Sequence, residues 1–210
     1  MKTRLVTVAA AFALIYGLPA MAQSRTQMLK GDFAFTTSAA CVVSPASFFP
    51  TYQPPAGFSP ALVPLGTSFV FTNSFQGVRT FNGDGTGSVT ARLVTVPISG
   101  AASANDVSGQ FTYSVAADRT LTIDDGPFHS VPVAGPGVGQ QQMVSNFPTY
   151  IGRLSSDGRS LTFATFNPGV EVVTMLVPAP ELVASVRICH RASNGIRISR
   201  TPGAGGMDED

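Results

Sequence analysis

The sequence is poor in charged side chains and in the residues that most often carry catalysis or bind metals. Lys, Arg, Asp and Glu make up only 12% of the 210 residues, and there are two histidines, two cysteines and no tryptophan. Thirteen basic against twelve acidic residues leave no basic field, so a nucleic-acid partner is not expected. The scarcity of charged helix formers, beside frequent Gly, Pro, Phe, Thr and Val, favours an all-β domain.

The few candidate catalytic or metal-binding residues are scattered. No His-x-x-x-His or Cys-x-x-Cys spacing surrounds His129 or His190, whereas zinc requires three or four ligands, so we predict no metal site and loop or surface positions for both. There is no Gly-x-Ser-x-Gly motif. Asp124 and Asp125 would point to opposite faces of a strand, and we assign them to a turn. No cofactor is expected, and an enzyme ranks third among the functions considered below.

A long apolar run lies at the N-terminus. Two basic residues precede the apolar residues 5–18, and residues 20–22 have the Ala-Met-Ala pattern of a cleavage site. This arrangement predicts a signal peptide over residues 1–22, because a membrane span needs about 20 apolar residues and this run is shorter. We expect cleavage after Ala22 and a periplasmic or secreted product.

The rest of the chain is nearly neutral and fits one domain. Removal of Lys2 and Arg4 lowers the basic residues from thirteen to eleven, against twelve acidic ones, which gives a formal charge of −1. Residues 23–200 are enough for one domain with a sizeable core. Three of the acids lie in a Gly-rich acidic tail, residues 201–210, which we predict to be disordered.

Glycine-rich turns between β-forming stretches recur along the chain. In residues 77–89, Asn82-Gly83 and Asp84-Gly85 supply the positive φ angles of a tight reversal, which predicts a β-hairpin. This turn resembles part of a calcium loop, but no acid stands at position twelve, so we assign it a structural role. Further turns are predicted at residues 117–119, 156–159 and 194–195. Strands are predicted over residues 32–43, 68–81, 89–93, 111–115, 121–123, 150–154, 161–165, 170–177, 182–190 and 196–199.

Two proline-rich stretches interrupt this pattern. Residues 44–65 and 125–148 are predicted to be long loops, the second with at most a short strand near residues 131–133. The first loop interleaves its prolines with four aromatic residues, Phe48, Phe49, Tyr52 and Phe58. We expect these side chains either to plug one end of the core or to act as a lid over the mouth of a cavity.

The short connections predict antiparallel neighbours. A meander of nine or ten strands must protect its edges, so we predict an antiparallel, up-and-down β-barrel of eight to ten strands, with a β-sandwich as the alternative. A membrane-spanning barrel is not expected, since the strands are uneven in length and proline-rich loops interrupt them.

The two cysteines support closure. Cys41 lies in the first predicted strand and Cys189 near the last, in a compartment that permits disulfides, so we predict a Cys41–Cys189 bond. Cys41 shares a face with aromatic residues, whereas Cys189 shares one with Arg187 and Arg191, which requires a rim position or a bulge.

The basic residues of a predicted C-terminal hairpin are assigned to a solvated outer face, with contact to anionic lipid or polysaccharide as the alternative. They are Arg187, His190, Arg191, Arg197 and Arg200.

A family resemblance follows from the order of these motifs. After the export signal and the early cysteine come Gly-Val-Arg-Thr-Phe-Asn-Gly-Asp-Gly-Thr-Gly from residue 77, Phe-Thr-Tyr at 111–113, Ser-Asp-Gly-Arg at 156–159 and Cys-His-Arg at 189–191. In this pattern the chain resembles uncharacterised exported bacterial proteins whose arrangement is similar to the calycin, or lipocalin-like, β-barrels. The resemblance covers most of the chain after residue 22 and implies a lipocalin-like barrel.

The leading hypothesis for function is noncatalytic binding of a small apolar or amphipathic molecule in the periplasm or outside the cell. The cavity would be faced by Phe71, Phe75, Tyr113 and Phe163. Arg79 shares the face of Phe75, and we expect it either to anchor an acidic group of the ligand or to reach water at the rim. The alternative is an envelope or secreted interaction protein whose barrel is a filled scaffold. The oligomeric state is left open.

Overall fold

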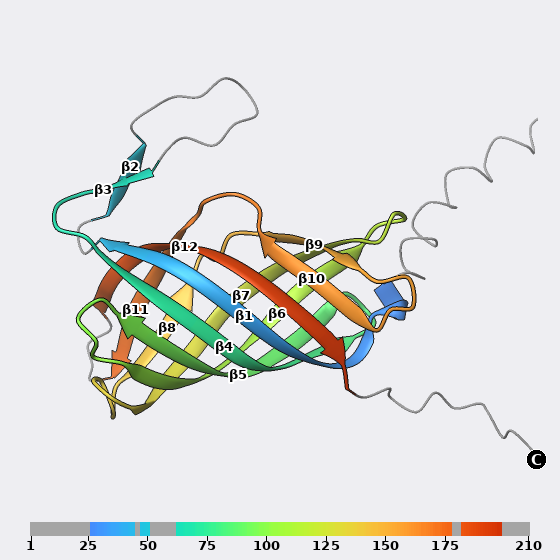
Figure 1. Ribbon diagram of the computed structural model, residues 1–210, viewed down its shortest axis with the longest axis horizontal. Helices are drawn as coiled ribbons and strands as arrows, with labels where there is room; N and C mark the ends of the chain where they lie inside the picture. Colours follow the sequence, from blue (N-terminus) through green and yellow to red (C-terminus); the bar gives the residue numbers. More distant parts are fainter. Residues whose placement is uncertain (1–25, 45–46, 51–61, 178–181, 199–210) are drawn as a thin grey trace, which may run out of the picture.

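The structure, a computed structural model, describes residues 26–44, 47–50, 62–177 and 182–198. Ten antiparallel strands form one sheet that closes into a ring (Figure 1). Neighbouring positions in the ring follow the order of the chain, two of them being shared by two short strands, and the first strand pairs with the last, which confirms the predicted up-and-down barrel. The strands of the barrel are β1 (Lys30–Ser44), β4 (Phe69–Asn82), β5 (Thr86–Pro97), β6 (Ser103–Val115), β7 (Thr120–Ala134), β8 (Gln141–Ser145), β9 (Tyr150–Leu154), β10 (Ser160–Thr165), β11 (Val170–Val177) and β12 (Leu182–Arg197). A separate ribbon pairs β2 (Phe48–Pro50) with β3 (Leu62–Pro64).

Two positions in the barrel wall are each shared by two short strands. β7 pairs with β9 through Thr120–Ile123 and with β8 through Phe128–Ser130. In the same way, β12 pairs with β11 along its first half and with β10 along its second. The six long strands and these two interrupted ones make a barrel of eight positions. A barrel of about eight strands is either filled by side chains or just wide enough for one small ligand.

One end of the barrel, on the right in Figure 1, is filled by an aromatic core. The rings of Phe33, Phe111 and Tyr113 meet the ring of Phe81 edge-on, at centroid distances of 5.3, 5.1 and 4.9 Å. Leu29 is fully buried, and its carbonyl accepts a 2.8 Å hydrogen bond from the Tyr113 hydroxyl. Burial of each such ring stabilises the fold by roughly 2–3 kcal/mol, so this closed end holds the barrel together.

The turn between β4 and β5 has the predicted structural role. Gly83 and Gly85 adopt φ angles of 87° and 94°, which the reversal needs. The Asp84 carboxylate accepts a 2.9 Å hydrogen bond from the Thr86 backbone N–H and a 2.7 Å bond from its hydroxyl. These bonds fix the hairpin, and with it the register of the two strands.

The stretch predicted as a second long loop, residues 125–148, is mostly strand. β7 continues to Ala134, and β8 follows after a short turn. Pro127 lies where the register between β6 and β7 shifts, and Pro132 lies beyond the residues paired with β8. The strand tolerates both prolines because a bulge or an unpaired position requires no ladder hydrogen bond from them.

β12 runs straight through Asn194-Gly195, so the predicted C-terminal hairpin is wrong. Both residues are paired with β1 on one side and with β10 on the other. A Cβ on Gly195 would lie only 2.9 Å from Leu161 Cδ1, so the glycine serves close packing inside the barrel. Pairing on two sides outweighs the local preference of Asn-Gly for a turn.

The disulfide joins the first and last strands from inside the barrel. Cys41 and Cys189 are directly opposite each other on β1 and β12, and they are bonded. The expected rim position or bulge is not needed, because Arg187 and Arg191 also point inward with Cys189. The predicted outer basic face is therefore wrong for both arginines.

Some predicted features lie outside the described residues. These are the signal peptide at residues 1–22, the acidic tail at 201–210, Arg200, and the loop aromatics Tyr52 and Phe58.

We expect the double variant Cys41→Ala/Cys189→Ala to keep its strand content but to unfold at lower urea concentration. The bond links residues 148 positions apart. Closing a loop of that size lowers the entropy of the unfolded chain and so raises the free energy of unfolding by about 5 kcal/mol at most. Urea unfolding followed by circular dichroism measures the loss, with the reduced wild type as the matched control. An unfolding midpoint equal to that of the oxidised wild type would contradict this role.

Candidate functional site

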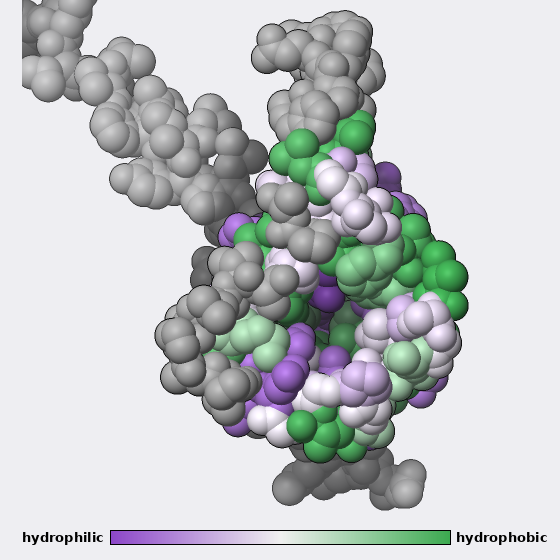
Figure 2. All heavy atoms as spheres, turned by 90° about the vertical axis from the view of Figure 1, so that its left-hand side faces the viewer, coloured by the Kyte–Doolittle hydropathy of each residue, from purple (hydrophilic) through white to green (hydrophobic). Residues whose placement is uncertain are grey.

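The end of the barrel opposite the aromatic core holds a cavity of about 300 Å³. Figure 2 looks onto this end and shows a hollow with hydrophilic residues in its depth. Ligand pockets span roughly 300–1,000 Å³, so the volume lies at the lower limit. It is about twice that of an engineered cavity of roughly 150 Å³ that takes up benzene. The space fits one small molecule.

The cavity wall is mainly apolar. Its apolar side chains are Val43, Phe69, Phe71, Phe75, Leu93, Pro97, Ala101, Val107, Phe128, Pro132, Pro136, Val144, Phe147 and Val173. Its polar side chains are Thr95, Ser103, Asn105, Ser130, Gln142, Ser185 and Arg187. Among the described residues that line the cavity, Arg187 is the one charged side chain.

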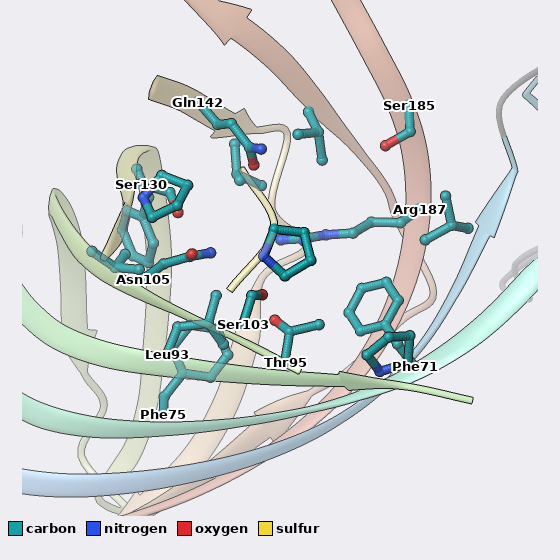
Figure 3. A pocket seen from close by; sticks show the side chains of 18 of the residues that line it. Phe71, Phe75, Leu93, Thr95, Ser103, Asn105, Ser130, Gln142, Ser185 and Arg187 are labelled. Carbon is teal, nitrogen blue, oxygen red and sulfur yellow. The ribbon is translucent and has the colours of Figure 1, made fainter. Parts of the chain in front are cut away.

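Arg187 extends from β12 into the middle of the cavity (Figure 3). Its Nε donates a 2.8 Å hydrogen bond to Glu171 Oε2, and its guanidinium lies 5.9 Å from the centre of the Phe71 ring. Burial lowers the pKa of Arg187; Glu171 opposes that effect, and the positive charge of Arg191 adds to it, so the pKa lies below its usual value. The charge on Arg187 is therefore only partly balanced by its surroundings.

Glu171 is the fully buried partner of both arginines. Arg191 Nη2 donates a 2.7 Å bond to Oε2, and Arg191 Nη1 bonds Oε1. Burial alone would raise the pKa of Glu171, but the charges and hydrogen bonds of Arg191 and Arg187 outweigh it and lower the pKa. One carboxylate thus serves two guanidinium groups.

A second ion pair lies deeper in the barrel. Arg79 Nη1 and Nη2 donate bonds of 2.8 and 2.9 Å to the two carboxylate oxygens of Asp125. The Arg79 guanidinium packs against aromatic rings, 4.8 Å from the centre of Phe111 and 5.3 Å from that of Phe163. The prediction of a rim position in contact with water is therefore wrong, since Arg79 is buried. The turn predicted at Asp124 and Asp125 is also wrong, because both lie in β7.

Asn105 presents an unsatisfied polar group at the cavity wall. The residue is 9% exposed, and its buried Oδ1 accepts no hydrogen bond within the described part of the chain. A buried carbonyl without a partner costs about 1–3 kcal/mol. Figure 3 shows Asn105 and Arg187 reaching toward each other from opposite walls.

The structure separates the predicted ligand-facing residues into two groups. Phe71 and Phe75 line the cavity, Tyr113 belongs to the aromatic core at the closed end, and Phe163 lies deeper in the barrel beside Arg79. Phe48 is half-buried in β2 and is not among the described residues that line the cavity, so its role as plug or lid stays a prediction.

Sequence reasoning missed Arg187 and Asn105. The available signal was strand alternation: Arg187 and Cys189 share a face, and a disulfide to the inward-facing Cys41 places that face inside. Asn105 gave no comparable signal, because it precedes residue 111, where the predicted strand of this region begins.

The histidines are exposed on the outer faces of their strands, His129 on β7 and His190 on β12, which confirms a surface position for both. Across the described ranges, no three His, Cys, Asp or Glu side chains are grouped as a metal ion would require. No helix in this part of the chain has the length and apolar character to cross a membrane.

A scan against protein-family models finds no match to the sequence. None of the curated proteins matches it either.

We expect Glu171→Gln to lower the free energy of unfolding by about 3–5 kcal/mol, because it leaves two buried guanidinium charges without a counter-charge. Since the native pKa of Glu171 is lowered, its contribution is present above the unfolded pKa of about 4.3 and is lost as the pH falls through the native pKa. Urea unfolding at pH 7 and pH 3 should show a smaller difference between variant and wild type at pH 3.

The matched control for Glu171 is Asp106→Asn. Asp106 forms an exposed ion pair with Arg92 on the outer face, and such pairs contribute about 0–1 kcal/mol. Equal losses from the two variants would contradict the buried role of Glu171.

Asn105→Leu should raise the free energy of unfolding by about 1 kcal/mol in the ligand-free protein. The leucine has a similar shape and removes the buried carbonyl that lacks a hydrogen bond. Thermal unfolding checks the gain, and Gln110→Leu on the outer face of the same strand controls for the general effect of a leucine. A lower melting temperature for Asn105→Leu alone would show that the amide is satisfied in the folded protein.

Proposed function

We propose that the protein is an exported, noncatalytic binding protein that holds one small apolar or amphipathic molecule in its barrel. The observation that carries this proposal is the cavity at one end, where apolar side chains surround one charged group and a few polar ones. This mixture is typical of small-molecule sites, in which apolar contacts give affinity and a few polar groups give orientation.

Two further observations support the proposal. The Cys41–Cys189 disulfide is compatible with an oxidising compartment outside the cytoplasm, which agrees with the signal peptide predicted over residues 1–22. The described lining of the cavity holds no carboxylate, imidazole or thiol, the groups on which acid–base and nucleophilic catalysis most often depend.

The alternative, an envelope or secreted interaction protein, is favoured by an exposed apolar row on the outer face. Val94 is paired with Ala104 on β6, which is paired in turn with Ala134 on β7, so the outward valines of β5 and β7 lie near one another. The exposed members are Val94, Val96, Val131 and Val133. Contiguous exposed apolar surface marks interaction sites, but this row leaves the cavity unexplained.

We expect Ser130→Phe to weaken the binding of octanol about tenfold or more, because the buried Ser130 side chain points into the cavity and a ring there occupies its space. His129→Phe is the matched control, since it adds the same ring one residue away on the outer face. Isothermal titration calorimetry measures both affinities.

Native mass spectrometry of the protein from its own periplasm or medium, followed by solvent extraction, then tests for a natural ligand. A bare chain, together with no octanol binding or equal binding by the two phenylalanine variants, would overturn the proposed function.

A further inference from the structure

We infer that the bound molecule carries a single carboxylate, which the guanidinium of Arg187 binds inside the cavity. This inference rests on the proposed function and names the chemical class of the ligand. It makes Arg187 the anchoring residue and Asn105 a second polar contact.

The terminal nitrogens of Arg187 are available to a ligand. Its hydrogen bond to Glu171 uses Nε, and its two terminal nitrogens form no hydrogen bond to any other described residue. Figure 3 shows the guanidinium in the open middle of the cavity. A guanidinium presents paired N–H groups that match the two oxygens of a carboxylate, so the geometry suits an acid better than a neutral polar group.

The charge balance of the interior points to an anion. Arg79 and Asp125 neutralise each other, whereas Glu171 is shared between Arg187 and Arg191. Among the described residues, the buried ion pairs of the barrel interior thus comprise three positive and two negative charges, with an excess of one positive charge. A buried charge without a counter-charge is costly, and one carboxylate at Arg187 would remove the excess.

Asn105 is the second, independent observation. It is nine-tenths buried, its Oδ1 lacks a partner, and it faces Arg187 across the cavity. The amide can present either its carbonyl oxygen or its NH₂ group after a flip, so it can bond a hydroxyl or an oxygen of the ligand. No described residue donates a hydrogen bond to Asn105 Oδ1.

The apolar wall and the volume of the cavity determine the size and character of the rest of the ligand. Phe71, Phe75, Phe128 and Phe147 surround the space beside the guanidinium. At about 300 Å³ the cavity holds a short alkyl or small aromatic body. Octanoate is therefore a suitable probe.

The experiment compares octanoate, octanol and octylamine by isothermal titration calorimetry at pH 7. These molecules share the alkyl chain and differ in the charge of the head group. We expect octanoate to bind about 10- to 100-fold more tightly than octanol, as for a hydrogen bond to a charged group, and octylamine to bind most weakly.

Variants of Arg187 identify the anchor. Arg187→Met should make the affinities for octanoate and octanol equal, whereas Arg187→Lys should keep part of the preference for octanoate because it keeps the charge. Arg92→Met is the control, since Arg92 is exposed on the outer face, and it should leave all three affinities unchanged. Thermal unfolding of each ligand-free variant shows whether it is folded.

The outcomes separate the two proposals. If all three probes bind equally well and Ser130→Phe blocks all of them, the binding function stands and the carboxylate inference is overturned. The same holds if Arg187→Lys and a folded Arg187→Met keep the wild-type preference for octanoate. If none of the probes binds and the native protein carries no ligand, the proposed function itself fails.

Discussion

The pairing of β12 on both of its sides is the constraint on which the rest of the structure depends. One edge of this strand closes the barrel against β1, and the other holds the interrupted strands β10 and β11. Because side chains alternate along a strand, this position sends Arg187, Cys189 and Arg191 to the same side. Closure therefore brings two positive charges into the barrel together with the cysteine that locks it.

Those two charges are incompatible with a tightly packed apolar interior around Arg187. A guanidinium taken from water loses several kcal/mol of solvation, and Glu171 can offset this cost fully for only one of its two partners. A tightly packed apolar interior around Arg187 would leave the remaining charge without water or a counter-charge. The cavity reduces that cost, because the 11% of the Arg187 side chain that stays exposed faces open space. Barrel closure and a hollow at one end are thus linked through one arginine.

Local patterns in the sequence predicted much of the barrel. The hairpin turns at Gly83–Gly85 and around Asp157 depend on residues within the turn, so they are visible in the sequence. The predictions were wrong where pairing with residues distant in the sequence determines the local conformation. Asn194-Gly195 is extended because β1 and β10 pair with it, and Pro127 is tolerated because β7 bulges at that point, where two of its residues lie opposite one residue of β6. The site depends on which face of β12 points inward, and a basic strand gives no local sign that its arginines are buried.

The two ends of the barrel differ in how completely their polar groups are hydrogen-bonded and their charges are balanced. At the closed end the Tyr113 hydroxyl bonds both the Gly83 N–H and the Leu29 carbonyl, and aromatic rings fill the space. At the cavity end Asn105 lacks a partner and Arg187 is only partly balanced, so this end gives up stability that apolar packing would supply. A bound acid would recover that loss and stabilise the native state in proportion to its affinity and concentration. The closed end thus supplies the stability that allows polar and charged groups at the other end to remain incompletely paired.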